Sequence, residues 1–387
     1  MSRFMDQYIR NEAEQQRAAK IDKLAASFAA RAAQHDREGS FPFENFADLR
    51  KAGYLQLTVP KAYGGDEISL YEMVQAQERL AYGDGSTALG VGWHLGQILY
   101  LRTSGKWPEA LFAAFCRDVV EQGAMLNVFA SEASSGSPSR GGRPETTAVR
   151  TDGGWLISGR KTFSTLSPIL DRFVVTAYIP EEDTVGEFLV QVNDRVSMEE
   201  TWDTLGMRGT GSHDIVLDQA FAAADTRIPG KGADEGGGWY LHIPACYMGI
   251  ALAARDFAVD FAANYKPSSI QGPIAELPLV QQSIGQMEAE LRTARCLLYA
   301  TADRWDHHEA LRPELRPELG LAKYTVTHSA LKVVDLAMRV VGGTSLSRTL
   351  PLERYYRDVR AGLHNPPMDN TVMQMLAATA LKERQQG

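Results

Sequence analysis

The sequence predicts an α+β protein in which helical regions flank a central β-domain, and three observations support this order. Residues 1–125 repeat apolar side chains at helical spacing, as at Leu24 and Phe28. Residues 126–232 change to short β-rich runs bounded by glycine turns, which is typical of antiparallel strands. Residues 233–387 return to long helical stripes. We therefore expect three packed domains with these boundaries, because 387 residues are too many for one simple core.

Composition argues against several classes of function. The net charge of −8 argues against a nucleic-acid surface, which needs clustered Lys and Arg. Cys116, Cys246 and Cys296 lie far apart without ligand spacing, so we expect thiols in a reducing cytosol. The polar N-terminus is unlike a secretory signal and no apolar run approaches a membrane span, which predicts a cytoplasmic protein without membrane contact. Residues 307–309, His-His-Glu, lack the spacing of zinc enzymes, so we expect no metal site.

The N-terminal region is expected to contain several helices separated by glycine turns. A short helix is predicted around Phe46 and should end at Gly53. Residues 60–65 form a proline-glycine turn that precedes a predicted helix over 69–81. The Gly-x-Gly-x-x-Ala match at 83–88 is not a dinucleotide fingerprint, because it follows a helical run and no βαβ pattern surrounds it. We interpret it as a helix-to-helix turn.

Two runs of small hydroxyl and glycine residues, 131–137 and 162–165, mark the β-domain. Between them lies an alternating segment with a Gly153-Gly154 turn, which predicts antiparallel strands. Small hydroxyl residues leave backbone N–H groups open, so both runs suit a phosphate-bearing or flat polar ligand. The alternative is that they are ordinary loops. Residues 230–238 are glycine-rich and acidic, which indicates a linker or a mobile lid.

The C-terminal region combines helical stripes with a conspicuous string at residues 341–358. Its Gly342-Gly343 pair allows backbone to approach a ligand closely. The charged residues that follow, 353–358, could equally form a plain surface salt network.

Taken together, these motifs resemble those of the acyl-CoA dehydrogenase family. The resemblance rests on the turn at 60–65, on Glu132 followed by Gly136-Ser137, and on Gly-x-Trp-x-Ile-x-Gly-x-Lys at 153–161. It is completed by the string at 341–358 and covers nearly the whole chain. The resemblance implies an N-terminal helical domain, a central antiparallel β-domain that carries a flavin, and a C-terminal four-helix bundle.

The resemblance also implies a cofactor site for FAD, with FMN less expected. On the β-domain, Ala130 and Ser131 should face the pyrimidine edge, Ser137 the diphosphate, Phe163 the ring face and Thr165 the N5 edge. Lys266, Arg339 and Gly343 match positions that hold the adenine side of a neighbouring subunit's FAD, so a homotetramer or homodimer is expected. Lys266 departs from the family's usual Arg, and an ammonium cannot fork onto a phosphate as guanidinium does. The set of predicted cofactor residues is completed by Val128, Gly342 and Thr371.

Catalytic roles follow from the same resemblance. Asp369-Asn370-Thr371 resembles the family's Glu-Gly-Thr triplet, so Asp369 is the candidate base; alternatively it caps the last helix. His364 and His94 match the two histidines of flavin monooxygenases on this fold, although His94 could instead be a satisfied core histidine.

The resemblance therefore implies FAD-dependent α,β-dehydrogenation of an acyl-CoA thioester, as in fatty acid metabolism, with an electron-transfer flavoprotein as the possible acceptor. The first alternative is a monooxygenase supplied with reduced flavin by a flavin reductase, or a nitroalkane-type oxidase, acting on another small organic substrate. The second alternative is a catalytically silent member that binds an acyl ligand.

Overall fold

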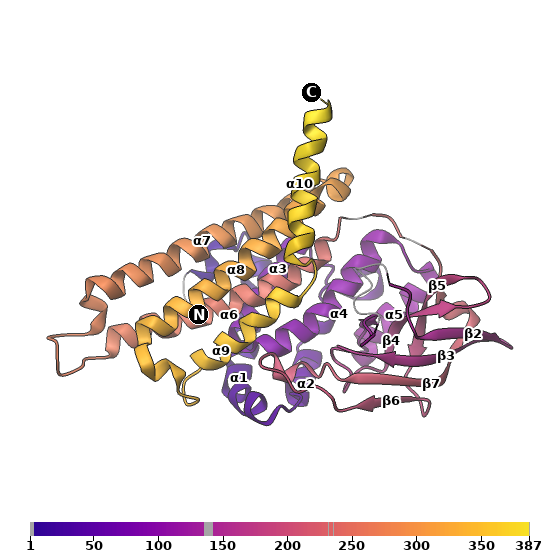
Figure 1. The fold of residues 1–387 in the computed structure, drawn as a ribbon, viewed down its shortest axis with the longest axis horizontal. Coiled ribbons are helices and arrows are strands. Elements are labelled where there is room, and N and C mark those ends of the chain that lie inside the picture. The colour runs from indigo at the N-terminus through magenta and orange to yellow at the C-terminus, as the bar shows by residue number, and fades with distance from the viewer. Residues whose placement is uncertain (1–3, 135–141, 231, 235, 387) are drawn as a thin grey trace.

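The computed structural model describes residues 4–134, 142–230, 232–234 and 236–386. Helices from both ends of the chain pack into one elongated body, and the β-domain lies against one end of it (Figure 1). This arrangement confirms the predicted fold class of helical, mostly antiparallel β and helical parts in that order.

Side-chain caps fix where two of the N-terminal helices begin. Ser69 caps α3 with a reciprocal capping box to Glu72, and Asp84 caps α4 by accepting from the Thr87 N–H at 3.1 Å. The 83–88 segment is thus the helix-to-helix turn that the sequence predicts. The helices of this region are α1 (Glu12–Glu38), α2 (Phe43–Lys51), α3 (Leu70–Gly83), α4 (Gly85–Ser104) and α5 (Glu109–Gln122).

The β-domain is one sheet with the order β6-β7-β3-β2-β4-β5-β8, and β1 pairs with β4. Most pairings are antiparallel, whereas β1 and β2 each pair with β4 in parallel. The predicted Gly153-Gly154 turn joins β2 to β3. The strands are β1 (Val128–Phe129), β2 (Thr147–Thr151), β3 (Gly154–Lys161), β4 (Arg172–Ile179), β5 (Thr184–Gln191), β6 (Val196–Glu199), β7 (Asp214–Ala223) and β8 (Arg227–Ile228).

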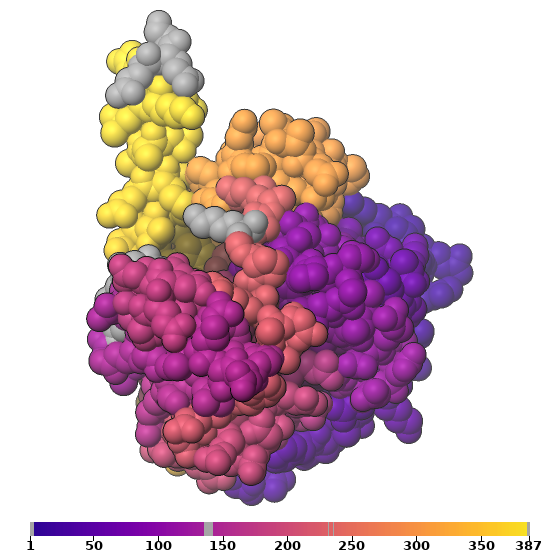
Figure 2. All heavy atoms as spheres, turned by 90° about the vertical axis from the view of Figure 1, so that its right-hand side faces the viewer, coloured from indigo at the N-terminus to yellow at the C-terminus, as the bar shows by residue number. Residues whose placement is uncertain are grey.

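The C-terminal helices pack on the N-terminal ones, with α6 lying between α3 and α8. The last helix, α10, stands away from the rest of the molecule (Figure 2). None of the helices described by the structure is both long and apolar enough to cross a membrane. The helices are α6 (His242–Asn264), α7 (Pro278–His307), α8 (Arg316–Val341), α9 (Leu352–Asp358) and α10 (Asp369–Gln386).

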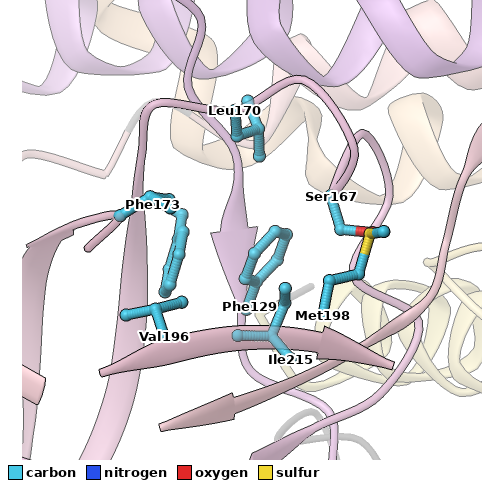
Figure 3. A pocket seen from close by; sticks show the side chains of 8 residues that line it. Phe129, Ser167, Leu170, Phe173, Val196, Met198 and Ile215 are labelled. Carbon is cyan, nitrogen blue, oxygen red and sulfur yellow. The ribbon is translucent and has the colours of Figure 1, made fainter. Parts of the chain in front are cut away.

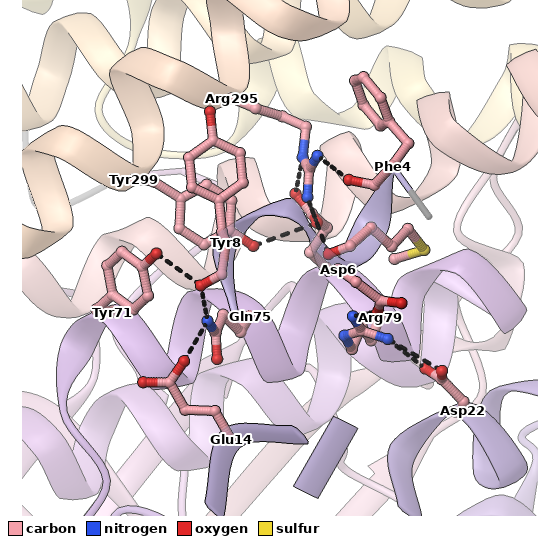
Figure 4. Close-up of polar contacts among 12 residues, drawn as sticks. Phe4, Asp6, Tyr8, Glu14, Asp22, Tyr71, Gln75, Arg79, Arg295 and Tyr299 are labelled. Carbon is pink, nitrogen blue, oxygen red and sulfur yellow. Dashed lines mark hydrogen bonds and ion pairs between the residues drawn. The ribbon is translucent and has the colours of Figure 1, made fainter. Parts of the chain in front are cut away.

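A buried ion pair ties the N-terminal segment to both helical regions (Figure 4). The Arg295 guanidinium is fully buried and donates to both Glu78 carboxylate oxygens, at 3.0 and 2.7 Å. It also donates to the Phe4 carbonyl at 2.7 Å, and the Tyr8 ring stacks on Tyr299. All of these bonds are made within the chain, so we interpret the cluster as structural.

A small cavity of about 70 Å³ lies inside the β-domain, beside the segment that follows the second hydroxyl run. Its lining is mostly apolar and includes Phe129, Phe173 and Ile215 (Figure 3). Ligand pockets usually measure about 300–1,000 Å³, so we assign no ligand to this cavity.

Candidate functional site

The second hydroxyl run, which follows β3, meets the loop that leads into the neighbouring strand β7. Three N–H groups of the 164–167 segment donate to carbonyls of the 210–213 segment: Ser164 to His213 at 3.2 Å, Leu166 to Thr210 at 3.1 Å and Ser167 to Gly211 at 3.2 Å. The Thr165 and Ser212 hydroxyls lie 2.9 Å apart, and Ser212 continues to Thr210 at 2.8 Å. The two loops therefore form one hydroxyl-lined edge.

Phe163 stands at this edge with its ring open to solvent. Its side chain is 68% exposed, and the neighbouring Leu205 is 65% exposed. The backbone of Phe163 has φ +55°, a left-handed conformation that side chains other than glycine adopt rarely and that often occurs at binding sites. Trp202 meets Phe163 edge-on at 5.9 Å between ring centroids. An exposed aromatic platform beside hydroxyl groups fits a flat ring system with polar edges, such as a flavin.

The first hydroxyl run begins beside the second. Ser131 accepts from the Thr162 N–H through its carbonyl at 2.9 Å, and the Asn127 amide donates to the Thr165 carbonyl at 2.9 Å. Val128 and Ala130 are half-buried on one side of the chain, while Phe129 between them points into the core. The structure thus brings the described residues of the predicted cofactor edge together. Ser137 lies outside the described residues.

Two residues of the resemblance motifs prove to form a buried ion pair, which sequence reasoning missed. The Lys161 ammonium donates to Glu132 at 2.6 Å, and the Thr146 hydroxyl and N–H donate to the same carboxylate at 2.6 and 3.1 Å. Burial alone would raise the pKa of Glu132, but these hydrogen bonds lower it to about 2. This pair fixes the start of the first hydroxyl run, at Glu132, onto β3.

Arg357 and Asp358 of the C-terminal string contact the loop between β6 and β7 and hold it in place. Asp358 accepts from the Met207 N–H at 2.7 Å, and burial raises the pKa of Asp358 to about 7. Arg357 donates to both oxygens of Asp36 at 2.8 and 2.5 Å, and to the Leu205 carbonyl at 2.9 Å. These residues therefore join the β-domain loop to α1 and α9 and do not form an independent surface network.

His94 is fully buried, and both of its ring nitrogens face backbone groups. One nitrogen pairs with the Leu55 carbonyl at 3.0 Å and the other accepts from the Leu126 N–H at 3.1 Å. Burial lowers the pKa of His94 to about 4, so the ring is neutral near pH 7. This placement favours the core role over the catalytic role, which stays a prediction.

Asp369 is the first residue of α10, and its carboxylate is directed at α8. One oxygen bonds His328 at 2.8 Å and the other lies 3.7 Å from the buried Lys323 ammonium. Three buried polar atoms meet here without a hydrogen-bond partner in the described chain: Lys323 Nζ, Thr327 Oγ1 and Asp369 Oδ1. The Val372 N–H bonds the Met368 carbonyl at 3.0 Å, and no side-chain cap from Asp369 is present in the described residues.

His364 ends a short 3-10 helix, η11 (Val359–His364), and is exposed. Its imidazole has no hydrogen-bond partner among the described residues. The next residue, Asn365, accepts from the buried Tyr247 hydroxyl at 2.5 Å, which anchors the segment between η11 and α10.

The predicted adenine-side residues lie far from this edge. Lys266 is exposed in the segment between α6 and α7, and Gly342 and Gly343 are exposed in the 3-10 helix η10 (Gly342–Leu346) that follows α8. In Figure 1 both segments lie at the end of the helical body away from the β-domain. Arg339 is 72% exposed and pairs with Asp335 at 2.8 Å. One chain cannot bring both sets to one FAD, so their joint use requires a second chain. Thr371 is exposed on α10.

Comparisons with known proteins cover the whole of this arrangement. Models described as the N-terminal, middle and C-terminal domains of acyl-CoA dehydrogenase match residues 11–106, 127–220 and 241–365. The "Putative acyl-CoA dehydrogenase YdbM" of Bacillus subtilis is 50% identical over 98% of this chain and 100% of its own. The "L-evernosamine nitrososynthase" of a Micromonospora species is 32% identical over 88% of this chain and 85% of its own.

A solved structure of KijD3 in complex with FMN and a dTDP-amino-keto sugar is similar throughout. It is 27% identical and superposes with a TM-score of 0.85, over 96% of this chain and 94% of its own.

Proposed function

This chain belongs to the acyl-CoA dehydrogenase family of flavin-dependent oxidoreductases, and we propose that it is a reduced-flavin-dependent monooxygenase of a small organic substrate. The observation that carries this proposal is the pairing of Asp369. A dehydrogenase base must be free to take a proton from the substrate α-carbon. Here one Asp369 oxygen is bonded to His328 and the other faces Lys323.

His364 gives a second, independent argument for the oxygenase proposal. It is an exposed imidazole without a partner in the described chain, on a segment held by Asn365 and Tyr247. An exposed imidazole is a common general acid or base in catalysis. A nitrososynthase and FMN-bound KijD3 are among the proteins similar to this chain, which agrees with this assignment.

The described residues of the β-domain edge fit a flavin. We assign Phe163 to the ring face, Thr165 and Ser131 to the polar edge, and Val128 and Ala130 to the neighbouring wall. When bound, reduced flavin supplies the two electrons with which molecular oxygen is activated. FAD remains the expected cofactor, because Lys266, Gly342 and Gly343 of a second chain could hold its adenine half. FMN, which the KijD3 structure contains, is the alternative.

Acyl-CoA dehydrogenation is the second candidate, and the 50% identity to YdbM favours it. In this candidate Asp369 would release His328, turn to the substrate and take the α-proton. The bound flavin would accept the β-hydrogen as hydride, and an electron-transfer flavoprotein would then take up the two electrons.

Anaerobic titration of the purified protein separates the two candidates. We expect it to bind reduced FMN or FAD more tightly than the oxidised form and then to consume O₂ when air is admitted. We expect His364→Ala to bind reduced flavin normally but to lose at least about ten-fold in substrate oxidation, because general acid–base groups contribute about 10²–10⁴-fold. Bleaching of bound oxidised flavin by butyryl-CoA or octanoyl-CoA would overturn the oxygenase proposal in favour of dehydrogenation. A protein that binds neither flavin form would refute both.

A further inference from the structure

One face of α4 carries an aromatic cluster that begins beside the proposed flavin edge. Gly90, Trp93, Gln97 and Tyr100 are spaced three, four and three residues apart, so they share one face of the helix. The Leu166 side chain, next to Thr165, packs on Gly90: a Cβ added there would lie 2.9 Å from Leu166 Cδ2. At about 1.5 Å rise per residue, Trp93 lies roughly one helical turn from that contact.

A short segment between the β-domain and α6 completes this cluster from the other side. It is the 3-10 helix η7 (Gly238–Leu241), which carries Trp239 and Tyr240. The Trp239 ring lies 6.0 Å from both Trp93 and Tyr100 and 3.8 Å from Tyr240 between ring centroids. All four aromatic rings remain half-buried in the folded chain. Four large rings that meet and all keep solvent-accessible surface are unusual for a completed core.

Two polar side chains within the cluster lack partners. Gln97 is only 6% exposed, yet its amide makes no hydrogen bond within the described chain. His242 is fully buried beneath Trp93, whose ring is 4.9 Å away, and its Nε2 has no partner there either. An unsatisfied buried polar group costs about 1–3 kcal/mol, so the buried His242 Nε2 calls for an explanation, and the unbonded Gln97 amide lies in the same cluster.

The hydrogen-bond character of each group follows from its surroundings. His242 Nδ1 lies 2.8 Å from the Trp239 carbonyl, which can only accept, so Nδ1 carries the proton. Burial lowers the pKa of His242 to about 4, so the ring is neutral and Nε2 is an acceptor. The Gln97 amide can both donate and accept. His242 Nε2 therefore lacks an N–H or O–H donor, and the Gln97 amide lacks a partner that can accept from it and donate to it.

We propose that this cluster binds the ring of an aromatic or heteroaromatic substrate that carries an N–H or O–H donor and an amide or similar polar group. The ring stacks on Tyr100 and Trp239, and Gln97 pairs with the polar group. His242 Nε2 accepts from the donor after the Trp93 side chain, which covers His242, moves away. This inference rests on the proposed function only for its location beside the flavin edge. The proposed ligand differs from a straight aliphatic acyl group, which has no polar group along its chain to bond Gln97 and His242.

Calorimetric titration with indole-3-carboxamide tests the proposal without any turnover. This probe has a ring, an N–H and an amide, whereas cyclohexanecarboxamide keeps only the amide and N1-methylindole-3-carboxamide loses the N–H. We expect indole-3-carboxamide to bind at least about ten-fold more tightly than cyclohexanecarboxamide. We expect N1-methylation to weaken it about five-fold, since one hydrogen bond contributes about 1 kcal/mol and 1.4 kcal/mol corresponds to ten-fold.

Variants locate the binding. Gln97→Leu and Trp239→Leu should each weaken indole-3-carboxamide at least about five-fold, whereas Gln16→Leu, an exposed glutamine on α1, should not change it. Circular dichroism and the thermal midpoint show whether each variant folds. The two variants lie on different elements, so the other one still tests the proposal if one fails to fold. The proposal is overturned if the saturated amide binds equally well, if both folded cluster variants bind like wild type, or if octanoyl-CoA binds and indole-3-carboxamide does not. Flavin titrated into the same samples reports on the proposed function separately, because neither variant alters the Phe163–Thr165 edge.

Discussion

Two buried lysine–carboxylate pairs in this protein have the same chemistry but different completeness. In the β-domain, Lys161 and Glu132 lie 2.6 Å apart, and Thr146 supplies further hydrogen bonds to the carboxylate. In the helical body, Lys323 Nζ and Asp369 Oδ1 form an ion pair at 3.7 Å, but these two atoms and Thr327 Oγ1 have no hydrogen-bond partner in the described chain. Both ammonium groups are 0% exposed.

The difference indicates what each pair does. Burying a charge is favourable only when hydrogen bonds replace the lost water, and the β-domain pair meets this condition. It holds the start of the first hydroxyl run, at Glu132, against β3, as a rigid platform for a ligand requires. The helical pair lies next to the segment that carries His364, and its unsatisfied atoms leave room for a water or for rearrangement during turnover. We therefore regard the first pair as a rigid structural element and the second as a loosely held contact at the start of α10.

The same substitution at the two lysines should lower the free energy of unfolding by different amounts, and the loss should be larger in the β-domain. Lys161→Met leaves the buried Glu132 without its counter-charge, so we expect the free energy of unfolding to fall by about 3–5 kcal/mol. Urea denaturation monitored by circular dichroism measures it. Lys332→Met is the matched control on the surface, because Lys332 pairs with Glu290 while 58% exposed. That control should cost less than about 1 kcal/mol. Equal losses in both variants would contradict a structural role for the Lys161 pair.

Acid should destabilise the complete pair in a defined pH window. The pKa of Glu132 falls from 4.5 in the unfolded chain to about 2 in the fold, since hydrogen bonds from Lys161 and Thr146 outweigh burial. A lowered folded-state pKa stabilises the fold above pH 4.5, and this stability is lost as the pH drops towards 2. Urea midpoints between pH 5 and pH 2.5 should therefore decline more steeply in the wild type than in Glu132→Gln. Parallel curves for the two proteins would show that Glu132 does not carry this dependence.

Lys323→Met tests the incomplete pair. Lys323 makes no hydrogen bond in the described chain, and burial lowers its pKa, so its ammonium contributes little that a methionine would lose. Asp369 is partly exposed and keeps His328 after the substitution. We expect a loss of no more than about 1 kcal/mol, against about 3–5 kcal/mol for the same change at Lys161. A loss as large as that of Lys161→Met would show that the two pairs are equivalent.

Sequence reasoning found the edge of the β-domain but not what holds it in place. The order of the hydroxyl runs, together with the family resemblance, predicted that Ser131 and Thr165 face one cofactor, and the bond from the Thr162 N–H to the Ser131 carbonyl brings the two runs together. Glu132 and Lys161 each belong to a motif of the family resemblance. The residues next to each of them in the sequence do not show that the two side chains pair in the core. Similarly, Asp369 has a helix-capping context in sequence, and only the packing of α10 on α8 directs it to His328.

Asp369→Asn should have the smallest effect and bears directly on the reaction. If the Asp369 pair supports the neighbouring segment but does not act as the base, reduced-flavin-dependent O₂ consumption should stay within about two-fold of wild type, because the amide can still bond His328. An oxygen electrode with FMN and a flavin reductase measures this rate. As the base of a dehydrogenase, the same residue would be indispensable, and its loss would cost at least about 10²-fold. Bleaching by octanoyl-CoA in wild type that disappears in Asp369→Asn would return Asp369 to the catalytic role, and the unsatisfied atoms around Lys323 would then mark where that carboxylate rests between turnovers.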